Sequence, residues 1–411
     1  MKTKQMKTRK IWLAAITIIL FLALGACVNP ADTDLNHSHE YSNWKVVTLP
    51  SGTEKKPGAE ARICSVCAAP ESRLLYTGNF TVTDIKGWEK AIADIKAGDD
   101  NGYYMITIDG TIAGLKPTTT VPTFGTKKGI TVLIKGSGTL SLSTGVGNMF
   151  LLGSNGNKQT LVIDGEELIL KGRNQTGSSS IINVGNGGEL LLNNGLLTGN
   201  TGSVSGGAVY VNTKGTFVME GGKISNNSAT NGGGVFVGTG ASGMGSGGRF
   251  IMSNGEISNN TAISYGGGMR IEQNGGFVMR SGKISGNSAA YGGAMYLYRG
   301  FSLMTGGEIS GNKATASSGG VYTYGSASTL FFLMNNGTVY GNEVSSTLAN
   351  TGAYAALRRD GTTQYGTLNR DLDKILSDWE KQGKVNTADW KSNGTLPSST
   401  STIKVVNGVK R

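Results

Sequence analysis

The sequence predicts an all-β fold: a right-handed parallel β-helix (a solenoid) with short capping helices at both ends and a small N-terminal module. Glycine supplies 65 of the 411 residues and proline only 7, which favours tight turns between short strands over disorder. Between residues 200 and 345 the chain repeats short alternating apolar runs separated by Gly and Asn. One such unit cannot bury its apolar face alone, whereas stacked units can.

Three columns of like residues define the repeat. In a parallel solenoid each coil lies about 4.8 Å above the last, and parallel crossovers favour right-handed winding. We expect the apolar columns, with Phe217, Phe250, Phe277 and Phe332, to point inward, and the asparagines to form an amide ladder at a turn. The columns are Met219, Met252, Met279, Met304 and Met334; Ile224, Ile257, Ile284, Ile309 and Val339; and Asn227, Asn260, Asn287, Asn312 and Asn342, with Leu192, Leu197 and Asn200 one coil earlier.

A second block of each coil predicts an outward-facing aromatic column. The block reads GGAVYV at 206–211 and GGAMYL at 292–297, with related segments at 232–237, 266–271 and 318–323. Its alternation puts the middle residue of each short strand on the outside. Two interpretations stay open: packing that stabilises an exposed sheet, or a platform for sugar rings and acidic groups. The outward residues are Tyr210, Phe236, Arg270, Tyr296 and Tyr322.

Helical periodicity occurs only beside the repeat. Trp88, Ala91, Ile92 and Ile95 share one face of a predicted helix that Asp84 begins and Gly98 ends. After the repeat, the same spacing joins Leu368, Leu372, Ile375, Leu376 and Trp379, with Gly383 following. We expect both helices to cover the open ends of the solenoid. The tail from Lys391 is expected to be loose, with one last strand in TIKVVNGV.

The N-terminus has the layout of a secretory signal. Five cationic residues lie within the first ten, and the apolar run from Ile11 to Leu24 is short for a transmembrane span. The run ends in Leu24-Gly25-Ala26-Cys27, which resembles the lipobox of bacterial lipoproteins. The resemblance implies that Cys27 is lipid-modified, with several acyl chains as a membrane anchor, and Val28 implies the outer membrane. A plain signal peptide is the alternative.

A small module follows, in which His37 and His39 precede Cys64 and Cys67. Two imidazoles and two thiolates make a complete tetrahedral set for one structural zinc. A Cys64–Cys67 disulfide in an oxidising compartment and unpaired thiols are the alternatives. Residues 37–76 resemble a zinc-ribbon-like repeat found near the N-termini of bacterial surface proteins. A full set of four ligands leaves no open position for a catalytic metal.

The charge balance limits the partners. The net charge is +11, and five of these charges lie in the predicted signal, so the mature chain carries about +6. This modest excess suits acidic glycans or lipids and gives no nucleic-acid footprint.

The repeats resemble the right-handed β-helix of pectin-lyase-like surface proteins and the GGA-type repeats of polymorphic outer-membrane proteins, over about residues 100–350. Enzymes of the first group use an aspartate cluster for calcium with an Arg or Lys base, or paired aspartates. This chain has no Asp between residues 165 and 359 and no His in the β-helix. Any catalysis would depend on Asp109, Asp164, Glu166 or Glu167.

Two further patterns favour structure over chemistry. Lys223, Glu256, Lys283 and Glu308 share one column and alternate in sign, which predicts neutralising neighbours on the surface. GTGASG at 238–243 matches GxGxxG but opens no helix, as a dinucleotide site requires. We interpret it as a loop bulging from one coil and as a weak binding candidate.

The sequence therefore predicts a lipid-anchored cell-surface or outer-membrane protein whose β-helix is a non-catalytic binding or adhesion scaffold. The ligand would be a carbohydrate or an extracellular protein, and the only cofactor one structural zinc. A polysaccharide lyase or hydrolase and a purely structural envelope component are the alternatives. The expected parts are a signal peptide (1–26), a lipidated tether (27–36), the small module (37–78), the β-helix with its N-terminal cap (79–365), and a C-terminal cap helix and tail (366–411).

Overall fold

The computed structural model describes residues 41–64, 70–241, 245–325, 331–345, 347–360, 363–382 and 389–411. The chain forms two compact units: residues 50–57 belong with residues 76–411, and the remaining described residues, 41–49, 58–64 and 70–75, form the smaller unit. The predicted signal and tether lie outside the described residues.

The smaller unit is a three-stranded antiparallel sheet. Its strands are β1 (Lys45–Thr48), β2 (Gly58–Ile63) and β3 (Pro70–Leu75), in that order. Arg62 lies 4.5 Å from the ring centre of Trp44 and pairs with Glu71 at 2.6 Å. Cys64 is buried at the end of β2, where its backbone bridges to Tyr41. The other three predicted zinc ligands, His37, His39 and Cys67, lie outside the described residues, so the zinc site stays a prediction.

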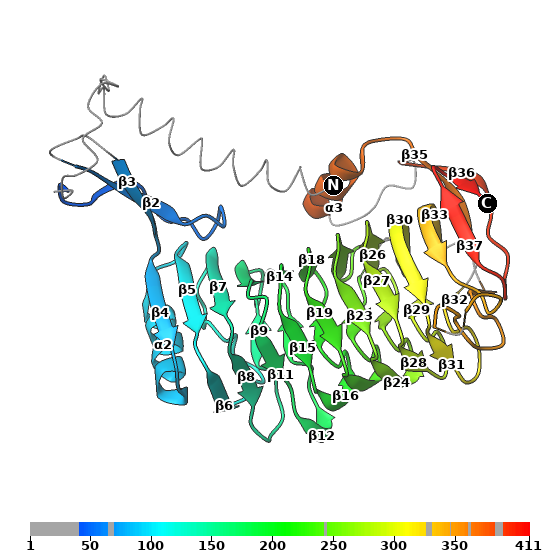
Figure 1. The fold of residues 1–411 in the computed structure, drawn as a ribbon, viewed down its shortest axis with the longest axis horizontal. Coiled ribbons are helices and arrows are strands. Elements are labelled where there is room, and N and C mark those ends of the chain that lie inside the picture. Colours follow the sequence, from blue (N-terminus) through cyan, green and yellow to red (C-terminus); the bar gives the residue numbers. More distant parts are fainter. Residues whose placement is uncertain are drawn as a thin grey trace. The chain divides into compact units, whose positions relative to one another are not determined.

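The larger unit is a parallel β-solenoid of about 10 turns and of the right-handed type, which confirms the predicted fold class. A typical coil consists of β18 (Thr216–Met219), β19 (Lys223–Ser225), β20 (Ser228–Asn231) and β21 (Val235–Val237). Successive coils stack side by side along the solenoid (Figure 1). Three sheets result, and the largest carries two strands from a typical coil, which we name row one and row two.

The strand bounds follow the coils. Row one contains β4 (Gly78–Val82), β5 (Tyr103–Ile108), β7 (Ile130–Gly136), β10 (Gln159–Ile163), β14 (Gly188–Leu192), β18, β22 (Arg249–Met252), β26 (Gly276–Met279), β30 (Phe301–Ser310), β33 (Phe331–Val339) and β35 (Thr363–Leu368). Row two contains β6 (Thr111–Leu115), β8 (Thr139–Leu142), β11 (Ile169–Lys171), β15 (Leu196–Thr198), β19, β23 (Glu256–Ser258), β27 (Lys283–Ser285) and the second halves of β30 and β33.

The two other sheets complete the coils. The six-stranded sheet contains β12 (Asn174–Ser178), β16 (Thr201–Ser205), β20, β24 (Thr261–Tyr265), β28 (Ser288–Ala289) and β31 (Lys313–Ala314). The eight-stranded sheet contains β9 (Phe150–Leu152), β13 (Ile182–Val184), β17 (Val209–Val211), β21, β25 (Met269–Ile271), β29 (Met295–Tyr298), β32 (Val321–Tyr324) and β34 (Leu357–Asp360).

The predicted inner columns stack in register. The five methionines pair from coil to coil, and so do the Ile/Val positions five residues later. The rings of Phe217 and Phe250 stack with centroids 4.5 Å apart, and Phe277 follows at 4.9 Å from Phe250. Phe332 is buried as expected, but its partner in the preceding coil is Ser302. The phenylalanine stack is therefore interrupted once.

The asparagine ladder forms, with one correction at its end. Each buried amide from Asn227 to Asn312 donates to the side-chain oxygen of the next, at 2.9–3.1 Å. The sequence alignment was wrong at Asn342, which is exposed; Asn350 closes the ladder instead. The coil that ends at Asn350 is longer than the others, so the regular spacing of the repeat points to Asn342 instead. The residue just before a ladder asparagine adopts a left-handed backbone conformation, as at Asn226 and Asn259.

The N-terminal helix covers the first coils as expected. Helix α2 (Ile85–Ala97) begins at Asp84, whose side chain accepts from the Gly87 backbone N–H, and Gly98 follows it. Trp88 and Ile95 lie buried in the solenoid core. The first coils thus have an apolar cover.

The C-terminal helix forms where predicted, but it lies beside the coils of β22 to β33 and does not cover the open end. In α3 (Leu372–Gln382), Leu376 and Trp379 pack on the outward side chains of row one, including Val278 and Leu303. A Cβ on Gly276 would lie 2.3 Å from the Trp379 ring, so only glycine admits this approach. The tail is ordered where we expected it loose: Leu396, Ile403 and Val405 enter the core. It adds β36 (Trp390–Thr395), β37 (Ile403–Val406) and β38 (Val409–Lys410).

Candidate functional site

The predicted outer column forms on the eight-stranded sheet. Its five residues pair in register across β17, β21, β25, β29 and β32, and Val209 and Val211 point into the core on either side of Tyr210. The members are those that the alternation indicated: Tyr210, Phe236, Arg270, Tyr296 and Tyr322.

Most rings of this column are covered by other side chains. Phe236, Tyr296 and Tyr322 are only 8%, 5% and 7% exposed. Tyr265 and Tyr291, from the neighbouring turns, stand over them: the Tyr265 ring lies 4.6 Å from that of Tyr296, and Tyr291 lies 6.0 Å from Tyr322. Buried ring faces cannot stack on a sugar, so these three positions support the packing interpretation.

Arg270 is held inside the column. Its guanidinium pairs with Glu272 at 2.5 Å and donates to the Asn231 side chain at 2.8 Å. The rings of Tyr265 and Tyr296 lie 4.8 and 5.4 Å from it. Burial, with the Glu272 carboxylate nearby, raises the pKa of Tyr210. The charge of Arg270 is therefore satisfied within the fold, and a ligand-binding role for it stays a prediction.

A groove lies on the outward side of row one, where sequence reasoning had placed no site. Two adjoining hollows of about 380 and 290 Å³ form it, and they share Lys55, Glu189, Thr216 and Arg249. Thr160, Glu189, Thr216 and Arg249 are consecutive rungs of one outward column. The groove therefore runs across successive coils, along the direction of stacking.

Residues 50–57, which we name the arm, form one wall of the groove. The Gly52 N–H donates to the Asn101 carbonyl at 2.7 Å, and the Thr131 hydroxyl donates to the Gly52 carbonyl at 2.6 Å. Thr53 bonds the Asn101 side chain at 2.8 Å. From this arm the ammonium of Lys55 reaches Glu189 on the groove floor at 2.5 Å.

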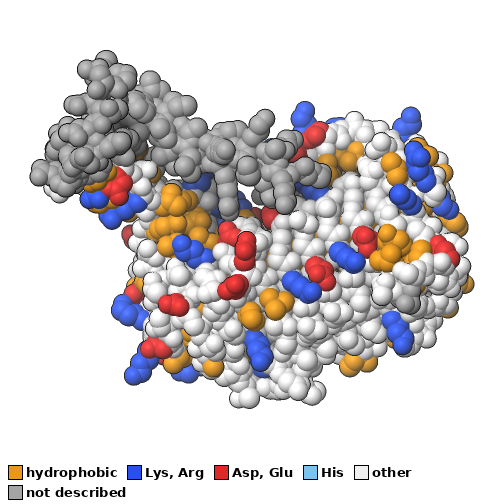
Figure 2. Space-filling view, viewed as in Figure 1, with side chains coloured by type: hydrophobic (Ala, Val, Ile, Leu, Met, Phe, Trp, Pro, Cys, Tyr) orange, Lys and Arg blue, Asp and Glu red, His pale blue; other side chains and the backbone are white. Residues whose placement is uncertain are grey.

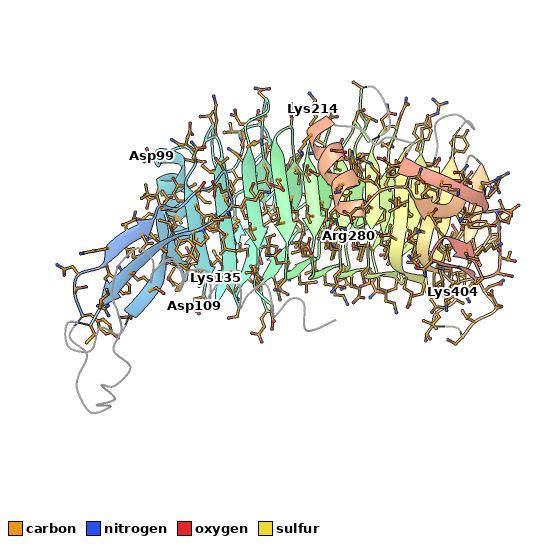
Figure 3. The ribbon with its side chains drawn as sticks, turned by 90° about the horizontal axis from the view of Figure 1, so that it is seen from above. Asp99, Asp109, Lys135, Lys214, Arg280 and Lys404 are labelled. Carbon is orange, nitrogen blue, oxygen red and sulfur yellow. The ribbon has the colours of Figure 1, made fainter. Side chains whose placement is uncertain are left out.

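Helix α3 forms the other wall. The Trp379 indole N–H donates to the Gly245 carbonyl at 2.8 Å, and Arg249 donates to the Trp379 carbonyl at 3.2 Å. Arg280 pairs with Asp373 of the helix at 2.5 Å. Figure 3 looks onto this face, with α3 crossing the strands and Lys214 and Arg280 labelled beside it.

Cations predominate in the lining of the groove. Five cationic side chains stand against three carboxylates, of which Glu189 and Asp373 have cationic partners. Lys158 and Lys214 are exposed and pair with no carboxylate among the described residues. Charges of both signs are interspersed on the face shown in Figure 2. The lining cations of the groove are Lys55, Lys158, Lys214, Arg249 and Arg280.

The candidate catalytic carboxylates lie elsewhere. Asp164 accepts a hydrogen bond from Asn194 at 2.6 Å, and Asp109, Glu166 and Glu167 are exposed. Among the described residues, no group of three or more His, Cys, Asp and Glu side chains could hold a metal ion.

The described part of the GTGASG segment, residues 238–241, bonds neighbouring turns. The Gly240 N–H donates to the Gln273 carbonyl at 2.9 Å, and Thr213 donates to the Thr239 carbonyl at 2.5 Å. Farther along, Gly245 accepts the Trp379 bond that fixes α3. This loop helps to build the groove wall, which gives it a structural role.

Comparison with family models, with curated proteins and with solved structures finds no match to this chain. The part of the chain that the structure describes contains no helix long and apolar enough to cross a bilayer. The fold is therefore established by the structure alone.

Proposed function

We propose that the protein is a non-catalytic binding scaffold whose groove holds an extended anionic polymer, in the first place an acidic polysaccharide. One observation carries the proposal: within the described part of the chain, Lys158 and Lys214 pair with no carboxylate, and the groove carboxylates Glu189 and Asp373 are already neutralised. Such a lining attracts an anionic chain and offers it charge-assisted hydrogen bonds.

The direction of the groove suits a chain better than a compact ligand. From Ile130 to Arg249 the floor crosses five consecutive coils, a distance of about 19 Å at the usual strand spacing. The arm lies over the coils of β5 and β7 and α3 over those from β22 to β33. The two therefore bound the floor at its ends, and a segment of the polymer would lie on the coils between them. The described lining contains no exposed aromatic ring, since Trp379 is buried. Recognition there would therefore depend mainly on charge.

Charge reversal tests the groove. Binding of an acidic polysaccharide to the full mature chain is measured by affinity electrophoresis at low and high salt. Lys158→Glu with Lys214→Glu should weaken binding by at least about tenfold at low salt, because two contacts become repulsive. The control pair, Lys171→Glu with Lys313→Glu, makes the same change of net charge on exposed residues outside the groove. Equal loss in both pairs would leave only non-specific attraction and refute the groove.

The location is part of the proposal: a secreted protein anchored through lipid on Cys27. The sequence before Cys27 supports it. Labelling of growing cells with a fatty-acid analogue should mark the wild-type protein, and Cys27→Ser should remain unlabelled in the membrane-free fraction. Labelling of the Cys27→Ser variant would contradict the anchor.

We also propose one structural zinc held by His37, His39, Cys64 and Cys67. Metal analysis of the purified full chain should find one zinc per molecule, and Cys64→Ser should lose it. Alkylation followed by mass spectrometry separates the alternatives. Two thiols that react only after chelation support zinc, whereas two thiols that react only after reduction indicate the Cys64–Cys67 disulfide.

A further inference from the structure

Tyrosine is concentrated on one face of the solenoid. The chain has 14 tyrosines, and eight of them belong to one connected network of ring and guanidinium contacts over the eight-stranded sheet, which we name the tyrosine face. Neighbouring members lie 4.6–6.4 Å apart between ring centroids, or contact a common arginine. Phe236 joins it through the stack with Tyr210. The tyrosines are Tyr210, Tyr265, Tyr291, Tyr296, Tyr298, Tyr322, Tyr324 and Tyr354.

The face has two layers with different exposure. Tyr296 and Tyr322 form a buried lower layer, and burial raises the pKa of Tyr296, so its hydroxyl stays protonated. Tyr298 and Tyr324 stand beside it as a parallel pair, with centroids 6.0 Å apart and planes inclined by 13°. Tyr324 is 47% exposed. The lower layer therefore lies beside a ring pair of which Tyr324 is exposed and Tyr298 half-buried.

An arginine with an unsatisfied donor borders these exposed rings. The guanidinium of Arg299 lies 5.7 Å from the Tyr298 ring, and its Nε is buried and has no hydrogen-bond partner among the described residues. Arg358 of β34 lies 5.5 Å from the Tyr322 ring and 4.9 Å from the Tyr354 ring, whereas Arg270 is already neutralised by Glu272. The guanidinium of Arg299 is half-buried and pairs with no carboxylate among the described residues. An anionic group on a ligand would neutralise it from the solvent side.

We propose that the tyrosine face is a second binding surface, separate from the groove, for a polysaccharide strand that carries acidic substituents. Sugar rings stack on Tyr298 and Tyr324, and one carboxylate or sulfate of the strand bonds Arg299. Rigid aromatic rings with an arginine give both contact area and orientation at low entropic cost. The groove discriminates by charge, whereas this surface recognises the ring faces of the sugar.

Salt separates the two surfaces. Stacking persists at high ionic strength, where exposed charge contacts are screened. The probes are carboxymethyl cellulose and hydroxyethyl cellulose, which share a backbone and differ in charge. We expect the wild-type full chain to retain salt-resistant binding of both polymers. The acidic one should be held more tightly, because the half-buried Arg299 is screened less than the exposed lysines of the groove.

Ring removal is the first test. Tyr298→Ala with Tyr324→Ala should weaken the salt-resistant binding by about tenfold, while the corresponding Phe pair keeps it. Tyr340→Ala is the matched control, because Tyr340 has no part in the ring network that the structure describes, and the groove pair Lys158→Glu/Lys214→Glu should leave the salt-resistant binding unchanged. Unaltered binding in the Ala pair, equal loss in the Phe pair, or no salt-resistant binding to either polymer would overturn the proposal.

Arg299→Gln provides a second test that leaves the rings in place. It should weaken binding of carboxymethyl cellulose severalfold and leave hydroxyethyl cellulose unaffected. Equal effects on the two polymers would refute the acidic contact. Thermal unfolding of each variant checks that the fold is retained. Failure of the groove would show only in the salt-sensitive binding, so the two proposals can fail independently.

Discussion

The asparagine ladder and the outer aromatic column both arise from the same sequence repeat, but only the ladder is completed by the repeated residue itself. Inside, each asparagine finds its partner in the identical residue one coil away, so the ladder satisfies itself. Outside, the rings stack only in part, and Arg270 needs Glu272 and Asn231 from other positions of the coil. A repeated inner residue therefore specifies the fold, whereas a repeated outer residue leaves surface that neighbours or ligands must complete.

The largest expected effect concerns the ladder. Asn260→Ala removes an amide that bonds the Ile224 carbonyl and Asn287, and it leaves the Asn227 backbone N–H without its acceptor. Stranded buried groups should lower the free energy of unfolding by about 3 kcal/mol, measured by urea denaturation. Asn254→Ala, an exposed turn residue in the same coil, should stay within about 0.5 kcal/mol of the wild type. Similar values for both variants would contradict the self-satisfying ladder.

The buried ion pair of the outer column should show a different pattern. Glu272→Leu strands the charge of Arg270 and should cost about 2 kcal/mol of unfolding free energy. Adding Arg270→Met should recover part of that loss, because no uncompensated charge remains. Urea denaturation of the two single variants and the double variant measures this. Simple additivity of the two single losses would mean that Arg270 and Glu272 are not coupled.

The exposed charge column should have the smallest effect. Lys223 pairs with Glu256 at 3.2 Å, and Lys283 pairs with Glu308 at 3.3 Å, as the alternating signs predicted. A double-mutant cycle of Lys223→Met and Glu256→Gln should give a coupling of about 0.5 kcal/mol at low salt. High salt should abolish it. A coupling that survives high salt would indicate a contact other than charge.

The sequence was sufficient for what repeats. The Met, Ile and Asn columns, the outward direction of Tyr210 and the cap helix begun by Asp84 all follow from local periodicity. The columns were misassigned where a coil departs from the repeat. A longer coil places Asn350 in the ladder instead of Asn342, and Ser302 stands where the phenylalanine stack predicted an aromatic ring.

The groove could not be predicted in the same way. The outward column of its floor could be read from the sequence, because Glu189, Thr216 and Arg249 each lie three residues before a position of the inward methionine column. Its walls come from residues 50–57 and from α3, far apart in the chain. Their docking depends on tertiary contacts such as the close approach of Trp379 to Gly276, which no periodicity signals.

Incubation of the soluble mature chain with a panel of acidic polysaccharides tests the central claim most directly. Co-sedimentation and the ultraviolet absorbance of unsaturated products are recorded on the same samples. We predict salt-sensitive binding that depends on Lys158 and Lys214, with no rise in absorbance. Rising absorbance would show a lyase and contradict the non-catalytic scaffold, and the absence of binding to every polymer would contradict the groove.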